Sequence, residues 1–421
     1  MTGELHGQML NLAKEARQAS RILVAVRGSQ KNAALRELAQ RLQTQADQVL
    51  AANQRDVDAA LSAGLDAARV DRLRITGSTI EGMAQACLEV MAQADPVGEI
   101  ESMWQRPNGL QFGRMRIPLG VVMMIFESRP NVTIEAAILT LKAGNAAILR
   151  GGSEAFHSNQ ALAALIADSL EAAGLPRAAV QLVPVTDREA VSHLLKLDEF
   201  IDVVIPRGGE SLIRAVSEQA TMPVLKHYKG VCHAYVDQDA DRDKALEIVF
   251  NSKVQRCGVC NALECLLVHE AEAEAFLPRV AQRLAESGVR FKCCSRSLPL
   301  MGVHAEAAEE EDWGREFLAL VLAVRVVRDM DQALEHIAAY GSNHTEAILT
   351  RDHDRAMRFL READASLVLV NASTRFNDGG QIGLGAEIGI STSKLHAYGP
   401  MGVRELTGLK FIGLGQGQVR E

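Results

Sequence analysis

The chain has 421 residues, of which 48% are hydrophobic, 23% are charged and 4% are aromatic, and its formal net charge is −8. This size and composition fit a globular protein of two or three domains and exclude a chain that is largely disordered. The negative charge and the scarcity of aromatic side chains argue against a nucleic-acid-binding protein, which needs a basic surface or stacking platforms.

The N-terminal part of the chain has the spacing of amphipathic helices. Residues 5–17 and 33–51 carry apolar side chains three and four positions apart, so we expect a helix in each stretch. The apolar run at 22–26 is too short for the core of a signal peptide, and no stretch of the sequence is long enough to cross a bilayer. Seven cysteines without the spacing of a disulfide framework are typical of reduced thiols. We therefore expect a cytoplasmic protein that does not enter a membrane.

Residues 104–118 differ in character from the helices before them. Asn108-Gly109 is a strong signal for a two-residue hairpin turn, and the residues around it alternate loosely. A two-stranded ribbon is rarely stable alone, so we expect this one to pack on another surface, with a neighbouring subunit as the candidate.

From Gly120 onward the pattern changes to strands that alternate with helices. Continuous apolar runs predict strands at 121–126, 146–149, 180–185 and 201–205, with helical segments between them at 133–142 and 159–172. Such runs are typical of a parallel sheet that is covered on both faces. A second α/β unit begins near residue 232 and extends to about 398. The predicted fold class is therefore α/β, with two parallel-sheet domains and a small β-hairpin element.

Two glycine-containing loops follow predicted strands of the first α/β unit, one after 146–149 and one between 201–205 and a helical segment at 212–216. Paired glycines let a backbone approach a ligand closely, and ligands of open α/β sheets bind at the carboxyl ends of strands. Because an arginine precedes each glycine pair, the two loops favour a phosphorylated ligand. Neither loop is a G-x-G-x-x-G fingerprint, and each alone could be an ordinary tight turn. The loop residues are Arg150, Gly151, Gly152, Ser153, Arg207, Gly208 and Gly209.

Cys260 is the candidate nucleophile. It lies in the segment 255–264, after a Gly-Val pair and before an Asn, just ahead of the apolar run 266–268. A cysteine in such a turn can expose its sulfur while the following backbone N–H groups face the atom that the sulfur attacks, as covalent acyl chemistry requires. The local sequence leaves two alternatives open: a buried, inert cysteine, or a redox or zinc pair with Cys257.

Several longer motifs extend over essentially the whole chain: Pro118–Val122, Glu127–Thr133, Lys142–Asn145, Leu149–Ser153, Val327–Ile348, Asn371–Phe376, Gly383–Ile390 and Gly399–Gly402. Together they resemble the gamma-glutamyl phosphate reductase (glutamate-5-semialdehyde dehydrogenase) family of the aldehyde dehydrogenase superfamily. The segment Val327–Ile348 resembles the most specific signature of that family.

The resemblance implies an aldehyde-dehydrogenase-like fold and NADPH-dependent reduction of L-glutamate 5-phosphate to L-glutamate 5-semialdehyde and phosphate. The reaction passes through a cysteine thioester and is the second step of proline biosynthesis. Residues 1–103 and 119–231 would form the NADP-binding domain, and 232–400 the catalytic domain. The hairpin 104–118 and the C-terminal segment 401–421 would then serve oligomerisation. We expect a homo-oligomer, a dimer or a tetramer, with glutamate 5-kinase as a candidate partner for substrate channelling.

The resemblance also implies roles for single residues. It selects Cys260 as the nucleophile and likens Asn131 to the oxyanion-hole asparagine of the superfamily. Arg150 takes the place of the lysine that handles the adenosine ribose and its 2′-phosphate, and Glu316 resembles the glutamate that bonds the nicotinamide ribose. We expect the rest of the two glycine loops to contact the cofactor as well.

Arg375 is the candidate for the α-carboxylate of the substrate, with Ser373 beside it, because a guanidinium group binds carboxylates in a bidentate manner. An interdomain ion pair is the alternative role for Arg375. His336 falls on a predicted helix between apolar residues and is expected to be structural.

One expected residue is missing. Oxidising aldehyde dehydrogenases use a glutamate to activate water, and the corresponding segment here, 225–230, contains no carboxylate. This absence fits a reductase, which must keep water away from its thioester. Lys226 and His227 in that segment are candidates for cofactor or phosphate charge, or form a solvated basic patch. The rival hypotheses are an oxidising semialdehyde dehydrogenase of the same fold and a zinc or dithiol protein built on Cys257 and Cys260. The cysteine spacing predicts no metal site.

Overall fold

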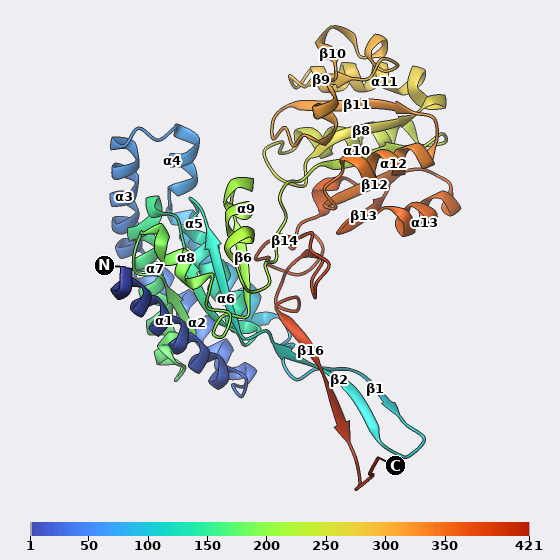
Figure 1. Ribbon diagram of the computed structural model, residues 1–421. Coiled ribbons are helices and arrows are strands. Elements are labelled where there is room, and N and C mark those ends of the chain that lie inside the picture. Colours follow the sequence, from blue (N-terminus) through green and yellow to red (C-terminus); the bar gives the residue numbers. More distant parts are fainter. Residues whose placement is uncertain (1, 421) are drawn as a thin grey trace.

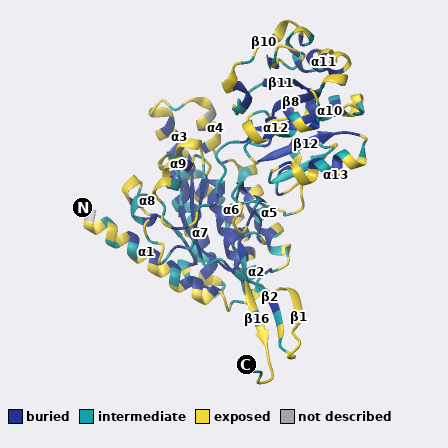
Figure 2. Ribbon diagram, turned by 45° about the vertical axis from the view of Figure 1, so that its right-hand side comes forward, coloured by how far each residue is buried: buried dark blue, intermediate teal, exposed yellow. Residues whose placement is uncertain are grey.

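The computed structural model describes residues 2–420 as two α/β lobes and a small antiparallel sheet that projects away from both (Figure 1). The strands inside the lobes are buried, whereas much of the projecting sheet is exposed (Figure 2). No helix within the described residues has both the length and the apolar character that a bilayer crossing requires.

The N-terminal lobe is built on a four-stranded parallel sheet with the order β5-β4-β3-β6. Its strands are fully apolar in their central parts because helices cover both faces. The strands are β3 (Val121–Phe126), β4 (Ala146–Arg150), β5 (Val180–Leu182) and β6 (Val203–Arg207). The helices are α1 (Thr2–Leu23), α2 (Gly28–Thr44), α3 (Ala46–Ser62), α4 (Ala67–Leu73), α5 (Gly77–Ala92), α6 (Asn131–Lys142), α7 (Phe156–Ala172), α8 (Arg188–Leu194) and α9 (Glu210–Gln219).

The C-terminal lobe contains a seven-stranded parallel sheet with the order β10-β9-β11-β8-β7-β12-β13. Alternate side chains of the strands enter two separate cores, so Leu266 packs with α10 and α11 while Leu267 packs with α12 and α13. The strands are β7 (Cys232–Val236), β8 (Leu263–His269), β9 (Arg290–Cys293), β10 (Ala305–Ala307), β11 (Val321–Val327), β12 (Thr345–Leu349) and β13 (Leu367–Val370). The helices are α10 (Arg242–Val254), α11 (Glu270–Ala285), α12 (Met330–Tyr340) and α13 (His353–Glu362).

The projecting sheet has three antiparallel strands in the order β1-β2-β16. Strands β1 (Ile100–Gln105) and β2 (Gln111–Pro118) form the predicted hairpin, whose turn places Gly109 at a φ of 87°. Strand β16 (Thr407–Leu414) comes from the C-terminal segment and pairs with β2 along its whole length. The C-terminal segment therefore completes the hairpin into a sheet, which supplies the packing that a two-stranded ribbon lacks.

Most predicted elements agree with the structure to within a few residues, and two differ. The single helix expected at 33–51 is divided at Gln45, whose φ of −116° leaves the helical region, and α2 and α3 then each pack against α7. Strand β5 ends at Leu182 rather than at 185. The chain returns from the C-terminal lobe through β14 (Ile390–Ser391) and β15 (Gly399–Pro400), and this returning segment lies against the N-terminal lobe.

Candidate active site

A cleft of about 460 Å³ lies between the two lobes and is lined by both of them and by the returning segment. The N-terminal lobe contributes the loops after β3 and β6, and the C-terminal lobe contributes the loop between α10 and β8. Carboxyl ends of parallel strands are the usual place for ligands of α/β sheets, and the ends of β3 and β6 follow this rule. Six residues named as candidates from the sequence line the cleft: Cys260, Arg207, Gly208, Gly209, His227 and Arg375.

The loop that carries Cys260 is held in place by its neighbour Asn261. The Asn261 side chain donates to the backbone oxygen of Asn377 at 2.9 Å, and the hydroxyl of Thr374 donates to the backbone oxygen of Asn261 at 2.7 Å. These contacts fasten the nucleophile loop to the short helical turn Thr374–Phe376. Arg375 in that turn therefore has a fixed position beside Cys260.

The backbone behind Cys260 is packed against Gly230 so closely that no side chain fits there. A Cβ atom on Gly230 would lie 1.9 Å from the backbone oxygen of Cys260. The same oxygen accepts a hydrogen bond from Cys232 Sγ at 3.1 Å, and the N–H of Gly230 donates to Glu316 at 2.9 Å. Glu316 thus shapes the wall behind Cys260.

The Cys260 thiol is protonated at rest. Its pKa is raised to about 12, mainly by burial and to a smaller extent by the nearby Glu387 and Glu316, whereas Arg207 lowers it. The sulfur therefore needs a base before it can attack. One ring nitrogen of His227 and one of His344 lie within 4.8 Å of the sulfur, so a base is at hand.

The cleft wall is rich in arginine. Arg129, Arg207, Arg72 and Arg256 lie near one another, and within the described residues none of them forms an ion pair with a carboxylate. Burial and the neighbouring guanidinium groups lower the pKa of Arg129. Unpaired like charges around a cleft are unfavourable unless an anion neutralises them, so this wall fits a phosphorylated ligand or cofactor.

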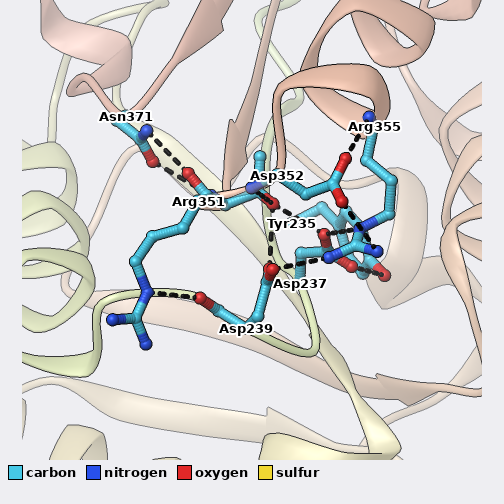
Figure 3. Close-up of polar contacts among 8 residues, drawn as sticks. Tyr235, Asp237, Asp239, Arg351, Asp352, Arg355 and Asn371 are labelled. Atoms are coloured by element: carbon cyan, nitrogen blue, oxygen red, sulfur yellow. Dashed lines mark hydrogen bonds and ion pairs between the residues drawn. The ribbon is translucent and has the colours of Figure 1, made fainter.

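A second hollow, of about 330 Å³, lies at the carboxyl ends of the C-terminal-lobe strands, but its charges satisfy one another (Figure 3). Arg355 bonds Asp237 at 2.5 Å and pairs with Asp239 at 2.7 Å. The hydroxyl of Tyr235 also donates to Asp237, at 3.1 Å. This network ties β7 to α13 and leaves the inter-lobe cleft as the candidate active site.

Comparison with known proteins agrees with this geometry. The aldehyde dehydrogenase family model matches residues 7–292. A gamma-glutamyl phosphate reductase from Nitratidesulfovibrio vulgaris is 64% identical over 98% of this chain and 99% of its own length. The crystal structure of gamma-glutamyl phosphate reductase from Thermotoga maritima superimposes with a TM-score of 0.96, at 44% identity over 98% of this chain and 100% of that one.

The chain belongs to the gamma-glutamyl phosphate reductase family of the aldehyde dehydrogenases. As in the superfamily, its chemistry uses a nicotinamide cofactor. The same fold occurs in a glyceraldehyde-3-phosphate dehydrogenase from Methanocaldococcus jannaschii complexed with NADP, which is 16% identical over 98% of this chain and 95% of its own length, with a TM-score of 0.65.

Some residues expected in the reductase site lie outside the cleft lining. The side chain of Asn131 donates to Glu135 at 2.7 Å, and Ser373 is buried with its hydroxyl 3.0 Å from Ser252. Arg150 donates to the backbone oxygens of Gly151 and Thr186. The position of Ser373 supports a role in holding the Arg375 turn, because its hydroxyl also accepts from the Arg375 N–H.

The two glycine loops have different surroundings. The turn that follows Arg150-Gly151-Gly152-Ser153 is tied to the cleft through Glu154, which accepts from the N–H and the hydroxyl of Ser128. In the other loop, the N–H of Gly209 donates to Glu127 at 3.1 Å. Because that amide is already occupied, the guanidinium of Arg207 is the stronger anion-binding group of the second loop.

Several residues at the site were not singled out from the sequence. They are His344, Arg72, Arg129, Arg256 and Glu387. Arg129, His344 and Glu387 lie inside family motifs, and membership of those motifs was the available signal. Arg72 comes from α4, far from any motif, and only the fold brings it to the cleft.

Proposed function

We propose that this chain reduces L-glutamate 5-phosphate to L-glutamate 5-semialdehyde and phosphate with NADPH, the second step of proline biosynthesis. The observation that carries the proposal is a cleft that combines the Cys260 thiol with arginine side chains lacking carboxylate partners. An acyl phosphate offers the thiol an electrophilic carbon and offers the arginines an anion. Relatives named for this activity match 98% of the chain.

In the first step, the sulfur of Cys260 attacks the acyl carbon and the bond between that carbon and the phosphate oxygen breaks. His227 is the group proposed to take the thiol proton. Its Nδ1–H donates to the Ile390 carbonyl at 2.9 Å, so Nε2 carries the free lone pair. The proton then passes to the leaving phosphate, so thiol and acyl phosphate become thioester and hydrogen phosphate.

NADPH, when bound, supplies the hydride that reduces the thioester. The aldehyde then leaves as the bond to sulfur breaks, and a proton from solvent restores the thiol through His227. Each tetrahedral species carries an oxyanion, for which the Cys260 N–H and the Asn131 amide are the proposed donors. Asn131 has to release Glu135 to take this role. Loss of one such donor typically costs about 3–4 kcal/mol of transition-state stabilisation.

Substrate recognition is assigned to the charged walls of the cleft. Arg375 is proposed to bind the α-carboxylate, since its turn is fastened to the nucleophile loop through Asn261. Arg129 and Arg256 are proposed to bind the acyl phosphate. Glu387 faces the same cleft and can bind the α-ammonium group.

The preference for NADPH over NADH is assigned to Arg150. Its guanidinium lies at the carboxyl end of β4, and the neighbouring Arg188 adds positive charge to that region. Gly151, Gly152 and Ser153 of the first loop and Arg207, Gly208 and Gly209 of the second are proposed to contact the cofactor, with Arg207 as the anion-binding group of the second loop. Glu316 is proposed to contact the nicotinamide ribose. Titrations of Arg150→Ala with both cofactors test the assignment: NADPH should lose about ten- to a hundredfold in affinity while NADH changes little.

We further propose a cytoplasmic homo-oligomer, dimer or tetramer, that can receive its substrate directly from glutamate 5-kinase. Acyl phosphates hydrolyse readily, which favours a short path between the two enzymes. Residues 1–103 and 119–231 form the proposed NADP-binding domain and 232–400 the catalytic domain. The projecting sheet is the proposed oligomerisation element.

The deciding experiment is the reverse reaction. With glutamate semialdehyde and NADP⁺, NADPH formation should require added phosphate, and arsenate should substitute for it because arsenate attacks an acyl centre in the same manner. Oxidation at full rate in phosphate-free buffer, with release of glutamate, would instead identify an oxidising dehydrogenase.

A further inference from the structure

Three potential metal ligands surround the nucleophile. A ring nitrogen of His227, the sulfur of Cys260 and a ring nitrogen of His344 all lie within 4.8 Å of one another. They come from three separate parts of the chain: the crossover before β7, the loop before β8 and the residue that precedes β12. The rings of the two histidines meet edge to face, with their centroids 5.5 Å apart.

The hydrogen bonds of the two histidines engage Nδ1 in each ring and leave Nε2 open to a ligand. Nδ1 of His227 lies 2.9 Å from the Ile390 carbonyl, and Nδ1 of His344 lies 2.7 Å from the Thr345 hydroxyl. Nε2 of His344 is fully buried and has no partner. In His227 the carbonyl acceptor keeps the proton on Nδ1 and leaves the Nε2 lone pair free, as the outer-shell partner of a metal-ligating histidine does. In His344 the Thr345 hydroxyl occupies Nδ1, so Nε2 is the nitrogen open to a ligand.

A second cluster of the same composition lacks these properties. His233 of β7, Cys265 of β8 and His336 of α12 lie together between the C-terminal-lobe sheet and that helix. Arg325 donates to Nδ1 of His336 at 2.9 Å, which places the ring proton on Nε2 and removes that nitrogen as a ligand. Burial alone lowers the pKa of His233, but its contact with Glu346 raises it to about 10, so this ring is an imidazolium. The second cluster therefore serves as a control.

We propose that His227, Cys260 and His344 form a binding site for a thiophilic divalent cation such as Zn²⁺, and that the bound cation blocks the nucleophile. Two imidazoles and a thiolate are ligands that Zn²⁺ prefers. His227 and Cys260 line the cleft, from which the ion can reach them. The thiol proton is released to solvent as the sulfur–metal bond forms. Ligand atoms around tetrahedral zinc lie about 3.5 Å apart. The separations between the three ligand atoms, at present up to 4.8 Å, would therefore shorten by about 1 Å when the ion binds. Binding of the cation does not depend on the proposed function. Only the expected inhibition of the enzyme by the bound cation rests on the proposed function.

The test is a titration of the full chain, freed of metal by chelation, with Co²⁺ and then with Zn²⁺. We expect one equivalent of Co²⁺ to give a thiolate-to-cobalt absorption band that Zn²⁺ abolishes. Cys260→Ala should remove the band, and His227→Gln and His344→Gln should each weaken binding at least tenfold. Cys257→Ala and Cys265→Ala should leave it unchanged. His344 is fully buried, so His344→Gln can fail to fold. In that case the binding titration of His227→Gln alone tests whether the histidines bind the ion.

Absence of the band in the wild type, its persistence in Cys260→Ala, or its loss in Cys265→Ala would each overturn the proposal. A second readout follows the thiol itself. Zn²⁺ should slow alkylation of Cys260 by iodoacetamide at least tenfold in the wild type and much less in His227→Gln, and equal protection in both would also overturn the site. Neither readout uses the reductase reaction, so a chain that binds cobalt but fails to reduce glutamyl phosphate would refute the proposed function alone.

Discussion

At the scale of single residues, the reactivity of Cys260 is set by its neighbours. Cys257 lies three positions away and is also half-buried, yet it does not line the cleft. The backbone of Cys260 packs against Gly230, and a ring nitrogen of His227 lies within 4.8 Å of its sulfur. Arginine side chains line the same cleft. The difference between an inert and a reactive thiol thus lies in the groups around the sulfur.

Replacing the two cysteines separately tests which one is the nucleophile. Cys260→Ala should abolish reduction of glutamyl phosphate while leaving cofactor affinity within about twofold, because the sulfur is the covalent centre. Cys257→Ala should retain activity. Steady-state rates and fluorescence titrations with NADPH would check both variants. An inactive Cys257→Ala together with an active Cys260→Ala would show that Cys260 is not the nucleophile.

The proposed proton transfer gives His227 a distinct pH signature. Burial lowers the pKa of His227 from its ordinary value of 6.5, so the imidazole stays neutral somewhat below that pH. Protonation of His227 therefore prevents thioester formation only in more acidic solution. The rate of Cys260 alkylation should therefore fall on an acidic limb below pH 6.5. In His227→Gln we expect a rate about 10²–10⁴-fold lower and no such limb. An unchanged pH profile in the variant would remove His227 from the mechanism.

At the scale of secondary-structure elements, a buried ion pair closes the loop that carries the nucleophile. Lys253 at the end of α10 lies 2.6 Å from Glu264 at the start of β8, and both side chains are fully buried. Glu264 also accepts from the N–H of Leu318, a cleft residue with a φ of 52°. A left-handed leucine is strained, so this hydrogen bond helps to hold the cleft wall in shape.

Breaking this ion pair should destabilise the C-terminal lobe. Lys253→Met leaves the Glu264 carboxylate buried without its partner, which typically costs about 3–5 kcal/mol. The double variant Lys253→Met, Glu264→Leu should recover much of that loss, because no isolated charge then stays buried. Denaturant unfolding of the three proteins measures the difference, and equal stabilities of the wild type and Lys253→Met would contradict the expected role.

At the scale of the whole molecule, the projecting sheet is the part that the single chain leaves uncovered. Trp104 on β1 and Phe411 on β16 pack edge to face, yet Phe411 is 68% exposed and Leu414 58% exposed. The outer edges of β1 and β16 also lack strand partners within the described residues. Exposed apolar side chains next to open strand edges are typical of a surface that another subunit covers.

Phe411→Ser should therefore shift the proposed oligomer toward a monomer without unfolding either lobe. Val303→Ser is the matched control, because Val303 is 95% exposed on the C-terminal lobe and away from the sheet. Sedimentation velocity of both variants at the same concentration measures the effect. An unchanged oligomer in Phe411→Ser, or dissociation in Val303→Ser, would place the interface elsewhere.

The sequence by itself determined the elements and the chemical class. Continuous apolar runs located β3 and β4, Asn108-Gly109 located the hairpin turn, and family motifs identified the reductase family, because each of these signals lies within a short stretch of chain. The position of Cys260 in a turn before β8 was predictable for the same reason. The break between α2 and α3 at Gln45 was not predictable from the sequence, since only the packing of both helices against α7 makes it favourable.

The tertiary structure alone decided which side chains meet. His227, Cys260 and His344 carry no common local pattern, and they become neighbours because parallel strands β7, β8 and β12 align their amino ends. The same holds for Arg72, which α4 brings to a cleft whose other arginines come from elements far away in the sequence. The third strand of the projecting sheet likewise comes from the C-terminal segment. Periodicity records how a residue sits in its own element, whereas proximity across the sheet depends on strand order, which no local pattern contains.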